Sequence, residues 1–302
     1  MAAGLPCCAA IGALYVGLLY VWRGRPRNHP GTIRRRMASV AATCLLSWLP
    51  AYLLAASRCA RPSHPAHHRL SLAPHLEDQS PAGVMHLLGL RADGLLAAVT
   101  LPLCLTATLF AGPLLLLALD ISDFDHVRFW PPSSLQAARD YLFAPITEEW
   151  AFRACMIPAL CLDSWSASRA VLLTPLFFGA AHLHHVHEAV VYQGCRLADA
   201  LAVMGFQMAY TTVFGWYAAW LLVRTGHVAA PIVAHAFCNF MGFPSFGRML
   251  GHRHRNPLLV SLVLGVVLFA VSICPLTDPT LYAWNTDSWA HPCTDPAMFI
   301  AP

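Results

Sequence analysis

The sequence contains no lysine and few charged residues of any kind. All 19 basic residues are arginine, and Asp, Glu, Lys and Arg together make up 11% of the 302 residues, whereas 57% are hydrophobic. A soluble domain normally has about 25% charged residues, because its surface faces water on all sides. The composition therefore excludes an ordinary soluble domain and indicates a protein that lies in a membrane.

Charge is also absent from six long runs of the chain. Each run has between 21 and 26 residues without Asp, Glu, Lys or Arg, and a helix needs about 20 mostly apolar residues to cross a bilayer. The alternating pattern of a lipid-facing β-barrel is missing, so the sequence predicts an all-α, polytopic membrane protein. The six runs are 1–22, 37–57, 94–119, 200–223, 225–247 and 256–277.

Two shorter apolar stretches, at 140–162 and 169–184, carry polar residues and raise the expected number of spans to about eight. Charged and histidine-bearing helices are tolerated in a membrane where they face a protein interior or a water-filled cavity. We therefore expect these two helices to border such a cavity. The other six expected spans are 1–22, 37–57, 94–119, 200–223, 227–247 and 256–277.

Six arginines cluster between the first two expected spans. The positive-inside rule places such a loop in the cytosol and the N-terminus on the opposite side. With eight spans, twelve arginines fall on the cytosolic side, six on the other side and Arg153 within a span, which favours this orientation. The cluster is short and has no interleaved aromatic residues, so it does not indicate a nucleic-acid site. Its members are Arg23, Arg25, Arg27, Arg34, Arg35 and Arg36.

Three charged residues interrupt the apolar stretch FAPITEEWAFRACMIP, which runs from Phe143 to Pro158. On a helix, Glu149 and Arg153 are i,i+4 neighbours and can form an ion pair. Glu148 points about 100° away from Glu149 and remains available. These three residues alone are compatible with a structural ion pair between spans and with part of a functional site.

Polar side chains on two other spans extend this group. His182 follows Phe178 by four residues, and His235 and Asn239 share one helix face at i,i+4. Polar groups left unpaired in lipid cost free energy, so we expect them to gather around one hydrated cavity. There a carboxylate can take a proton from water beside an imidazole, and a histidine–asparagine pair can stabilise an oxyanion. This combination supports amide hydrolysis by activated water.

In their order along the chain, these motifs resemble those of a known family. The sequence has Glu-Glu-x-x-x-Arg at 148–153, Phe-x-x-x-His at 178–182 and His-x-x-x-Asn at 235–239. Together they are similar to the motifs of CAAX prenyl endopeptidases of the Ras-converting type, over residues 140–247. The resemblance implies an endoplasmic-reticulum membrane enzyme with a cytosol-facing catalytic cavity, which removes the last three residues of prenylated CAAX proteins.

The resemblance also implies the role of each site residue. Glu148 would be the general base and His182 its partner on the water. His235 and Asn239 would stabilise the transition state, with Glu149 and Arg153 in supporting positions. The resemblance implies no metal or other cofactor. The expected partners are prenylated CAAX C-termini and the lipid bilayer, and the oligomeric state is not predicted.

On this interpretation the chain has three regions. An N-terminal region of three spans covers 1–136, the catalytic core covers 137–247, and the last span and a tail cover 248–302. Three alternatives remain. Glu148, His182 and His235 suit a catalytic zinc, although HExxH is missing and Asn239 would have no role. A non-enzymatic scaffold or a proton carrier is also compatible with the hydropathy, but a carrier would need acids in several spans and only one has them.

Overall fold

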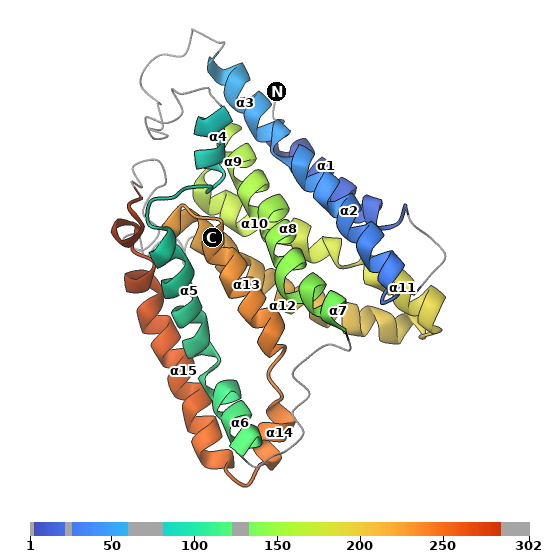
Figure 1. Ribbon diagram of the computed structural model, residues 1–302, viewed down its shortest axis with the longest axis vertical. Coiled ribbons are helices and arrows are strands. Elements are labelled where there is room, and N and C mark those ends of the chain that lie inside the picture. Colours follow the sequence, from blue (N-terminus) through green and yellow to red (C-terminus); the bar gives the residue numbers. More distant parts are fainter. Residues whose placement is uncertain (1–2, 22–25, 60–80, 123–132, 285–302) are drawn as a thin grey trace.

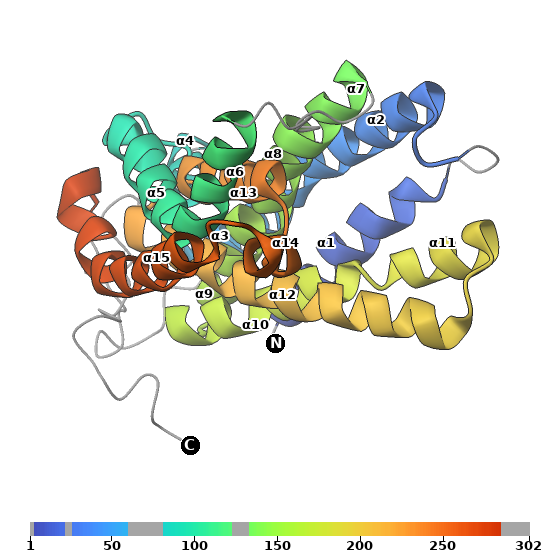
Figure 2. The ribbon, with the colours of Figure 1, turned by 90° about the horizontal axis from the view of Figure 1, so that it is seen from below.

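The computed structural model describes residues 3–21, 26–59, 81–122 and 133–284 of the chain, and every regular element in these ranges is a helix. This confirms the all-α prediction. Helices α1 and α2 lie on one side of the molecule, and α5, α6 and α15 lie on the other, with α7–α9 and α13 between them (Figure 1, Figure 2).

The first side begins with α1 (Gly4–Leu19), α2 (Pro30–Ser47) and α3 (Leu49–Cys59). Helix α2 starts where the ring of His29 accepts a hydrogen bond from the Gly31 amide at 3.1 Å, with Pro30 in the first turn, a position that proline favours. Helices α2 and α3 continue each other as one apolar stretch, Pro30–Ser57, which contains the expected span 37–57. The short α4 (Pro81–Leu87) follows.

The opposite side is formed by α5 (Leu95–Leu109), α6 (Ala111–Ser122) and α15 (Arg255–Leu276). Helices α5 and α6 occupy the expected span 94–119, but their axes differ by 80° at a break around Phe110. Helix α15 packs closely against them because Gly265 has no side chain, and a Cβ there would overlap the Thr108 carbonyl oxygen. Small residues commonly allow such close contact between membrane helices.

A central helical run extends over 134–162. It starts after Ser133, whose hydroxyl accepts a hydrogen bond from the Gln136 amide at 3.3 Å. It contains two π-helical segments, a geometry that is often found at functional sites. Its parts are α7 (Ser134–Ala138), π-helix Arg139–Phe143, α8 (Ala144–Glu149), π-helix Trp150–Cys155 and α9 (Met156–Leu162). The second half, 151–162, is buried throughout and forms the centre of the hydrophobic core.

The remaining helices enclose this run. Helices α10 and α12 pack tightly where Gly179 meets Thr212 and where Gly215 meets Pro175. Helix α12 is followed by its C-cap Gly226, whose φ of 63° is in the left-handed region. The elements are α10 (Ala167–Ala181), α11 (His184–Gln193), α12 (Leu197–Thr225), α13 (Ala229–Met241), α14 (Phe246–Gly251) and a 3₁₀ turn, Pro279–Tyr282.

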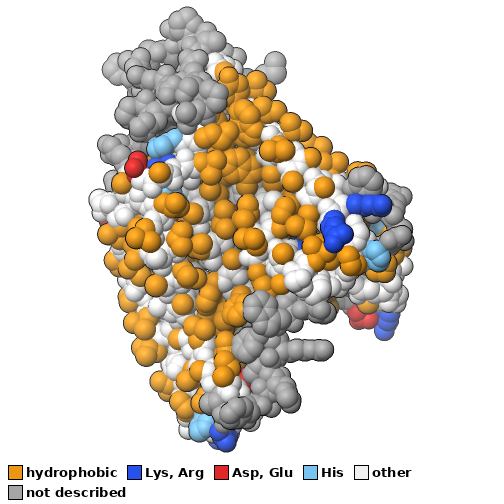
Figure 3. Space-filling view, viewed as in Figure 1, with side chains coloured by type: hydrophobic (Ala, Val, Ile, Leu, Met, Phe, Trp, Pro, Cys, Tyr) orange, Lys and Arg blue, Asp and Glu red, His pale blue; other side chains and the backbone are white. Residues whose placement is uncertain are grey.

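Three helices within the described ranges are long and apolar enough to cross a membrane, namely Pro30–Ser57, Leu197–Thr225 and Arg255–Leu276, or four if the bent pair α5–α6 counts as one span. Helices α1, α10 and α13 correspond to three other expected spans but have 16, 15 and 13 residues. Hydrophobic side chains cover most of the face in Figure 3, with charged groups mainly near its edges. On α15, Val260, Val263 and Val271 are more than 60% exposed, which fits contact with lipid.

The close packing of α12 gives a testable prediction. A Cβ at Gly215 would lie 2.7 Å from Pro175 Cβ and 2.9 Å from Nη2 of the buried Arg153. We expect Gly215→Ala to destabilise the protein by about 1–3 kcal/mol, because overpacking displaces its neighbours. The matched control is Gly205→Ala in the same helix, where a Cβ meets nothing within 4 Å. Thermal unfolding in detergent should show a lower midpoint for Gly215→Ala alone; equal midpoints would contradict the predicted clash.

Candidate active site

Glu148 and Glu149, adjacent in sequence, lie in different environments. Glu149 is fully buried, and its Oε1 accepts a hydrogen bond from Nη1 of Arg153 at 3.1 Å. The side chain of Glu148 is 21% exposed and lines a pocket. The expected i,i+4 ion pair is therefore confirmed, and so is the separation of the two carboxylates. It arises at the end of α8, where the π-helical segment Trp150–Cys155 begins.

Phe178 packs against the arginine of the buried ion pair. The guanidinium carbon of Arg153 lies 4.2 Å from the centroid of the Phe178 ring, a cation–π contact. The same ring packs edge-on against His182, with centroids 4.8 Å apart. Phe178 thus connects the arginine to the histidine one turn further along α10, which gives the Phe-x-x-x-His spacing a structural reason.

His182 lies at the C-terminal end of α10 and lines the pocket together with Glu148. Its Nδ1 is 2.8 Å from the carbonyl oxygen of Phe178, so Nδ1–H is the donor of this hydrogen bond. In the neutral imidazole, Nε2 is then the nitrogen that accepts a proton. The structure therefore brings together the two residues that were predicted to act on a water molecule.

His235, on α13, contacts both glutamates. Its Nδ1 donates a hydrogen bond to Oε1 of Glu149 at 2.7 Å, and its Nε2 lies 3.8 Å from Oε2 of Glu148. The ring is only 6% exposed and packs against Phe214, with centroids 4.9 Å apart. One side chain therefore bridges the buried ion pair and the carboxylate that faces the pocket.

Asn239 is placed differently from His235. Its Nδ2 donates a hydrogen bond to the Asp140 carbonyl oxygen at 2.8 Å, and the residue is exposed. Asp140 lines the pocket, whereas His235 and Asn239 do not. The donor atoms of the two residues have separate partners, Glu149 for His235 and the Asp140 backbone for Asn239. Their shared action on an oxyanion stays a prediction, and it requires Asn239 to turn away from Asp140.

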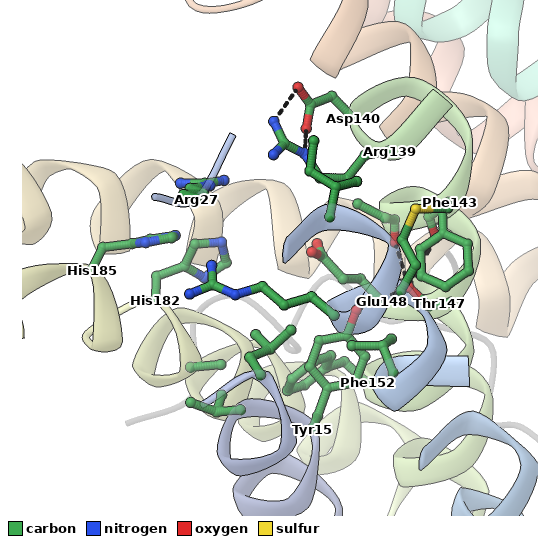
Figure 4. Close-up of a pocket in the computed structure, with 18 of the residues that line it drawn as sticks. Tyr15, Arg27, Arg139, Asp140, Phe143, Thr147, Glu148, Phe152, His182 and His185 are labelled. Atoms are coloured by element: carbon green, nitrogen blue, oxygen red, sulfur yellow. Dashed lines mark hydrogen bonds and ion pairs between the residues drawn. The ribbon is translucent and has the colours of Figure 1, made fainter. Parts of the chain in front are cut away.

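Figure 4 shows the pocket itself, with the Glu148 carboxylate directed into the space that Arg27, His182 and His185 border. One wall comes from α1 and α2, which the motifs did not include. Tyr15 of α1 reaches the central run, where its hydroxyl hydrogen-bonds to Oγ1 of Thr147 at 2.9 Å. Hydropathy predicted α1 and α2 as spans, but no local pattern in the sequence signals that they face the site.

The zinc alternative finds no support in the geometry. In the described ranges, no group of three or more His, Cys, Asp and Glu side chains is arranged to hold a metal ion. Glu148, His182 and His235 therefore do not form the compact ligand set that a catalytic zinc requires.

Comparison with known proteins places the chain in a family. A sequence model described as Type II CAAX prenyl endopeptidase Rce1-like matches residues 130–241. The CAAX prenyl protease 2 of Homo sapiens is 38% identical over 286 residues, with 91% of this chain and 81% of the human protein covered. The chain belongs to this family.

Other relatives agree with this assignment. The CAAX prenyl protease 2 of Arabidopsis thaliana is 35% identical over 225 residues, covering 68% of this chain and 71% of the relative. That of Saccharomyces cerevisiae is 27% identical over 283 residues, covering 79% and 81%. No solved structure matches the chain. The region matched by the family model contains all three motifs at 148–153, 178–182 and 235–239.

The buried ion pair leads to a second prediction. Glu149→Gln would leave the Arg153 guanidinium without a carboxylate in an apolar interior, which typically costs about 3–5 kcal/mol. We expect a clearly lower unfolding midpoint in detergent. Asp199→Asn, which removes an exposed acid from α12, serves as the control and should change the midpoint little.

A double variant separates charge from packing. Glu149→Leu together with Arg153→Met removes both charges, and well-packed apolar replacements of a buried pair are often neutral or stabilising. We expect its stability to recover relative to Glu149→Gln, while activity stays low because His235 loses its carboxylate partner. A double variant as unstable as the single one would show that the isolated charge is not the cause.

Proposed function

We propose that this chain is an intramembrane endopeptidase that removes the C-terminal tripeptide from prenylated CAAX proteins, Ras-type small GTPases among them. The observation that carries the proposal is the pairing of Glu148 and His182 in one pocket, directly beside the buried Glu149–Arg153–His235 cluster. Membership of a family whose relatives are named CAAX prenyl protease 2 supports the same activity and substrate class.

In the proposed reaction, the Glu148 carboxylate takes a proton from a water molecule that His182 orients. The water oxygen forms a bond to the carbonyl carbon of the prenylcysteine, in the peptide bond to the next residue, and the carbonyl oxygen becomes an oxyanion. As this intermediate collapses, the C–N bond breaks and the proton on Glu148 passes to the leaving amine. The products are a prenylcysteine carboxylate and a free tripeptide. Proton transfer of this kind typically contributes about 10²–10⁴-fold to the rate.

His235 and Asn239 are proposed to stabilise the oxyanion. Nε2 of His235 lies 3.8 Å from the Glu148 carboxylate, adjacent to where the tetrahedral intermediate would form. Because Nδ1 already carries the proton that bonds to Glu149, donation from Nε2 to the oxyanion requires the imidazolium form of His235. Its Nδ1–H bond to Glu149 holds the ring orientation, as carboxylates do for other functional histidines. Asn239 would exchange its bond to the Asp140 carbonyl for one to the oxyanion. Glu149 and Arg153 act through His235 and Phe178 and do not touch substrate.

The membrane arrangement is part of the proposal. We infer about eight spans. Four are the three long apolar helices and the bent pair α5–α6, and the other four are α1, α10, α13 and the central run 134–162. The catalytic core corresponds to 137–247, between regions 1–136 and 248–302. The arginine cluster between the first two spans supports a cavity that faces the cytosol. The proposed location, the endoplasmic-reticulum membrane, follows from the family resemblance. A prenyl chain favours the bilayer, so a site open to its cytosolic surface can bind the lipid and the peptide beside it.

The activity is tested directly with purified protein and a farnesylated CAAX peptide. We expect release of the C-terminal tripeptide, and a kcat/KM at least about tenfold lower for the same peptide without the farnesyl group, because apolar burial contributes about 0.8 kcal/mol per CH₂. A metal chelator should not change the rate. Equal rates with and without farnesyl would contradict the substrate assignment, and loss of activity in chelator, restored by zinc, would favour the metal mechanism.

The roles of the site residues are tested by kinetics on the same peptide. Glu148→Gln should lower kcat by about 10²–10⁴-fold. Asn239→Ala should lower it by about 10²–10³-fold with little change in KM, because an oxyanion donor acts mainly in the transition state. Asp199→Asn again serves as the control. Wild-type turnover by Glu148→Gln would exclude it as the base, and wild-type turnover by Asn239→Ala would exclude it as a donor.

A further inference from the structure

The pocket beside Glu148 has two chemically different borders. Its wall from α1 and α2 is apolar and includes Val16, Leu19, Ile33, Met37 and Val40. Its rim is basic, with the arginines Arg27, Arg36 and Arg139, whereas its carboxylates are Glu148 and Asp140. Three arginines therefore lie at the border of the pocket, close to the proposed general base.

Two of the three arginines already have acidic partners. Arg139 forms an ion pair with Asp140 at 2.6 Å, and its Nη1 also donates to Asn28. Nη1 of Arg36 lies 3.9 Å from Glu188, and its guanidinium covers the ring of Tyr20. Arg27 is exposed, and it forms no ion pair or hydrogen bond with any described part of the chain. Figure 4 shows its side chain beside His182 and His185, at the edge of the pocket.

The proposed substrate brings a negative charge to this position. An enzyme that removes three residues cuts at a fixed distance from a free C-terminal carboxylate. Three extended residues span at most about 10–11 Å. A cation at the pocket rim that binds the terminal carboxylate can therefore fix which peptide bond lies at the catalytic water. Guanidinium binds carboxylate well because its planar N–H groups match both oxygens.

We infer that Arg27 binds the terminal carboxylate of the substrate and thereby selects peptides with three residues beyond the prenylcysteine. This inference rests on the proposed function. The two aliphatic residues of the CAAX sequence would then lie against the apolar wall of α1 and α2, and the scissile bond would lie at Glu148. Arg27 is a specificity-determining residue in this arrangement, and it takes no part in proton transfer.

The test compares two farnesylated CAAX peptides that differ only at the C-terminus, one a free acid and one an amide. We expect wild-type kcat/KM to be about tenfold higher for the acid, because the amide cannot form the charge-assisted hydrogen bonds that a carboxylate forms with guanidinium. Arg27→Gln should lower kcat/KM for the acid by about the same factor, mainly through KM, and leave the amide unchanged. Arg27→Lys should recover part of the preference.

Two controls complete the design. Arg34→Gln removes the same charge from an exposed site of α2 that does not line the pocket, and it should keep the wild-type preference. A farnesylated peptide with one extra C-terminal residue moves the carboxylate by about 3.5 Å. Wild type should cleave it poorly, and Arg27→Gln should discriminate less between the two lengths.

The outcomes separate this inference from the proposed function. If wild type cleaves neither peptide, the endopeptidase assignment itself is wrong. If wild type cleaves acid and amide equally, or if Arg27→Gln slows both by the same factor, carboxylate recognition is excluded. An equal loss on both peptides would instead indicate that Arg27 binds a lipid phosphate or supports the fold. The inference is supported if Arg27→Gln loses the preference for the free acid and Arg34→Gln keeps it.

Discussion

The site depends on one buried positive charge. Arg153 has no exposure to solvent, and an uncompensated ion in an apolar interior costs several kcal/mol. Its charge is compensated by an ion pair with Glu149, one turn earlier, and by a cation–π contact with the ring of Phe178 on α10. Because Glu149 also accepts the Nδ1–H bond of His235, the same charge holds α13 in place. Three segments that are far apart in the sequence are thereby oriented around a single guanidinium.

This arrangement explains how two identical adjacent side chains acquire different roles. Glu149 balances the arginine and is inaccessible, so it cannot meet a substrate. Glu148, turned by the helix toward the pocket, retains its carboxylate for chemistry. His235 contacts both, so the ion pair that stabilises the core also positions a group beside the proposed base. The proposed mechanism therefore couples stability to catalysis, and it predicts that residues which do not touch substrate affect turnover.

Much of this could be predicted from local sequence signals, and the remainder depends on tertiary contacts. The i,i+4 spacing predicted the Glu149–Arg153 pair, because this contact depends only on residues one helical turn apart. The 80° bend near Phe110 was not predicted, since that stretch has uninterrupted hydropathy. Nor was the contact of Tyr15 with Thr147, 132 residues away. Asn239 satisfied its helical spacing, yet its amide bonds to a backbone carbonyl that no pattern identified.

The residues proposed for chemistry and those proposed for substrate selection lie in two different parts of the chain. The family model covers 130–241 and contains each residue proposed to act on the scissile bond. The apolar wall of the pocket and Arg27 lie outside it, in α1, α2 and their connection. A hydrolytic centre constrained by a buried ion pair tolerates little change, whereas a wall of aliphatic side chains can vary in size without disturbing it. The N-terminal helices are therefore where differences in peptide preference between relatives should arise, with the same carboxylate–histidine centre retained.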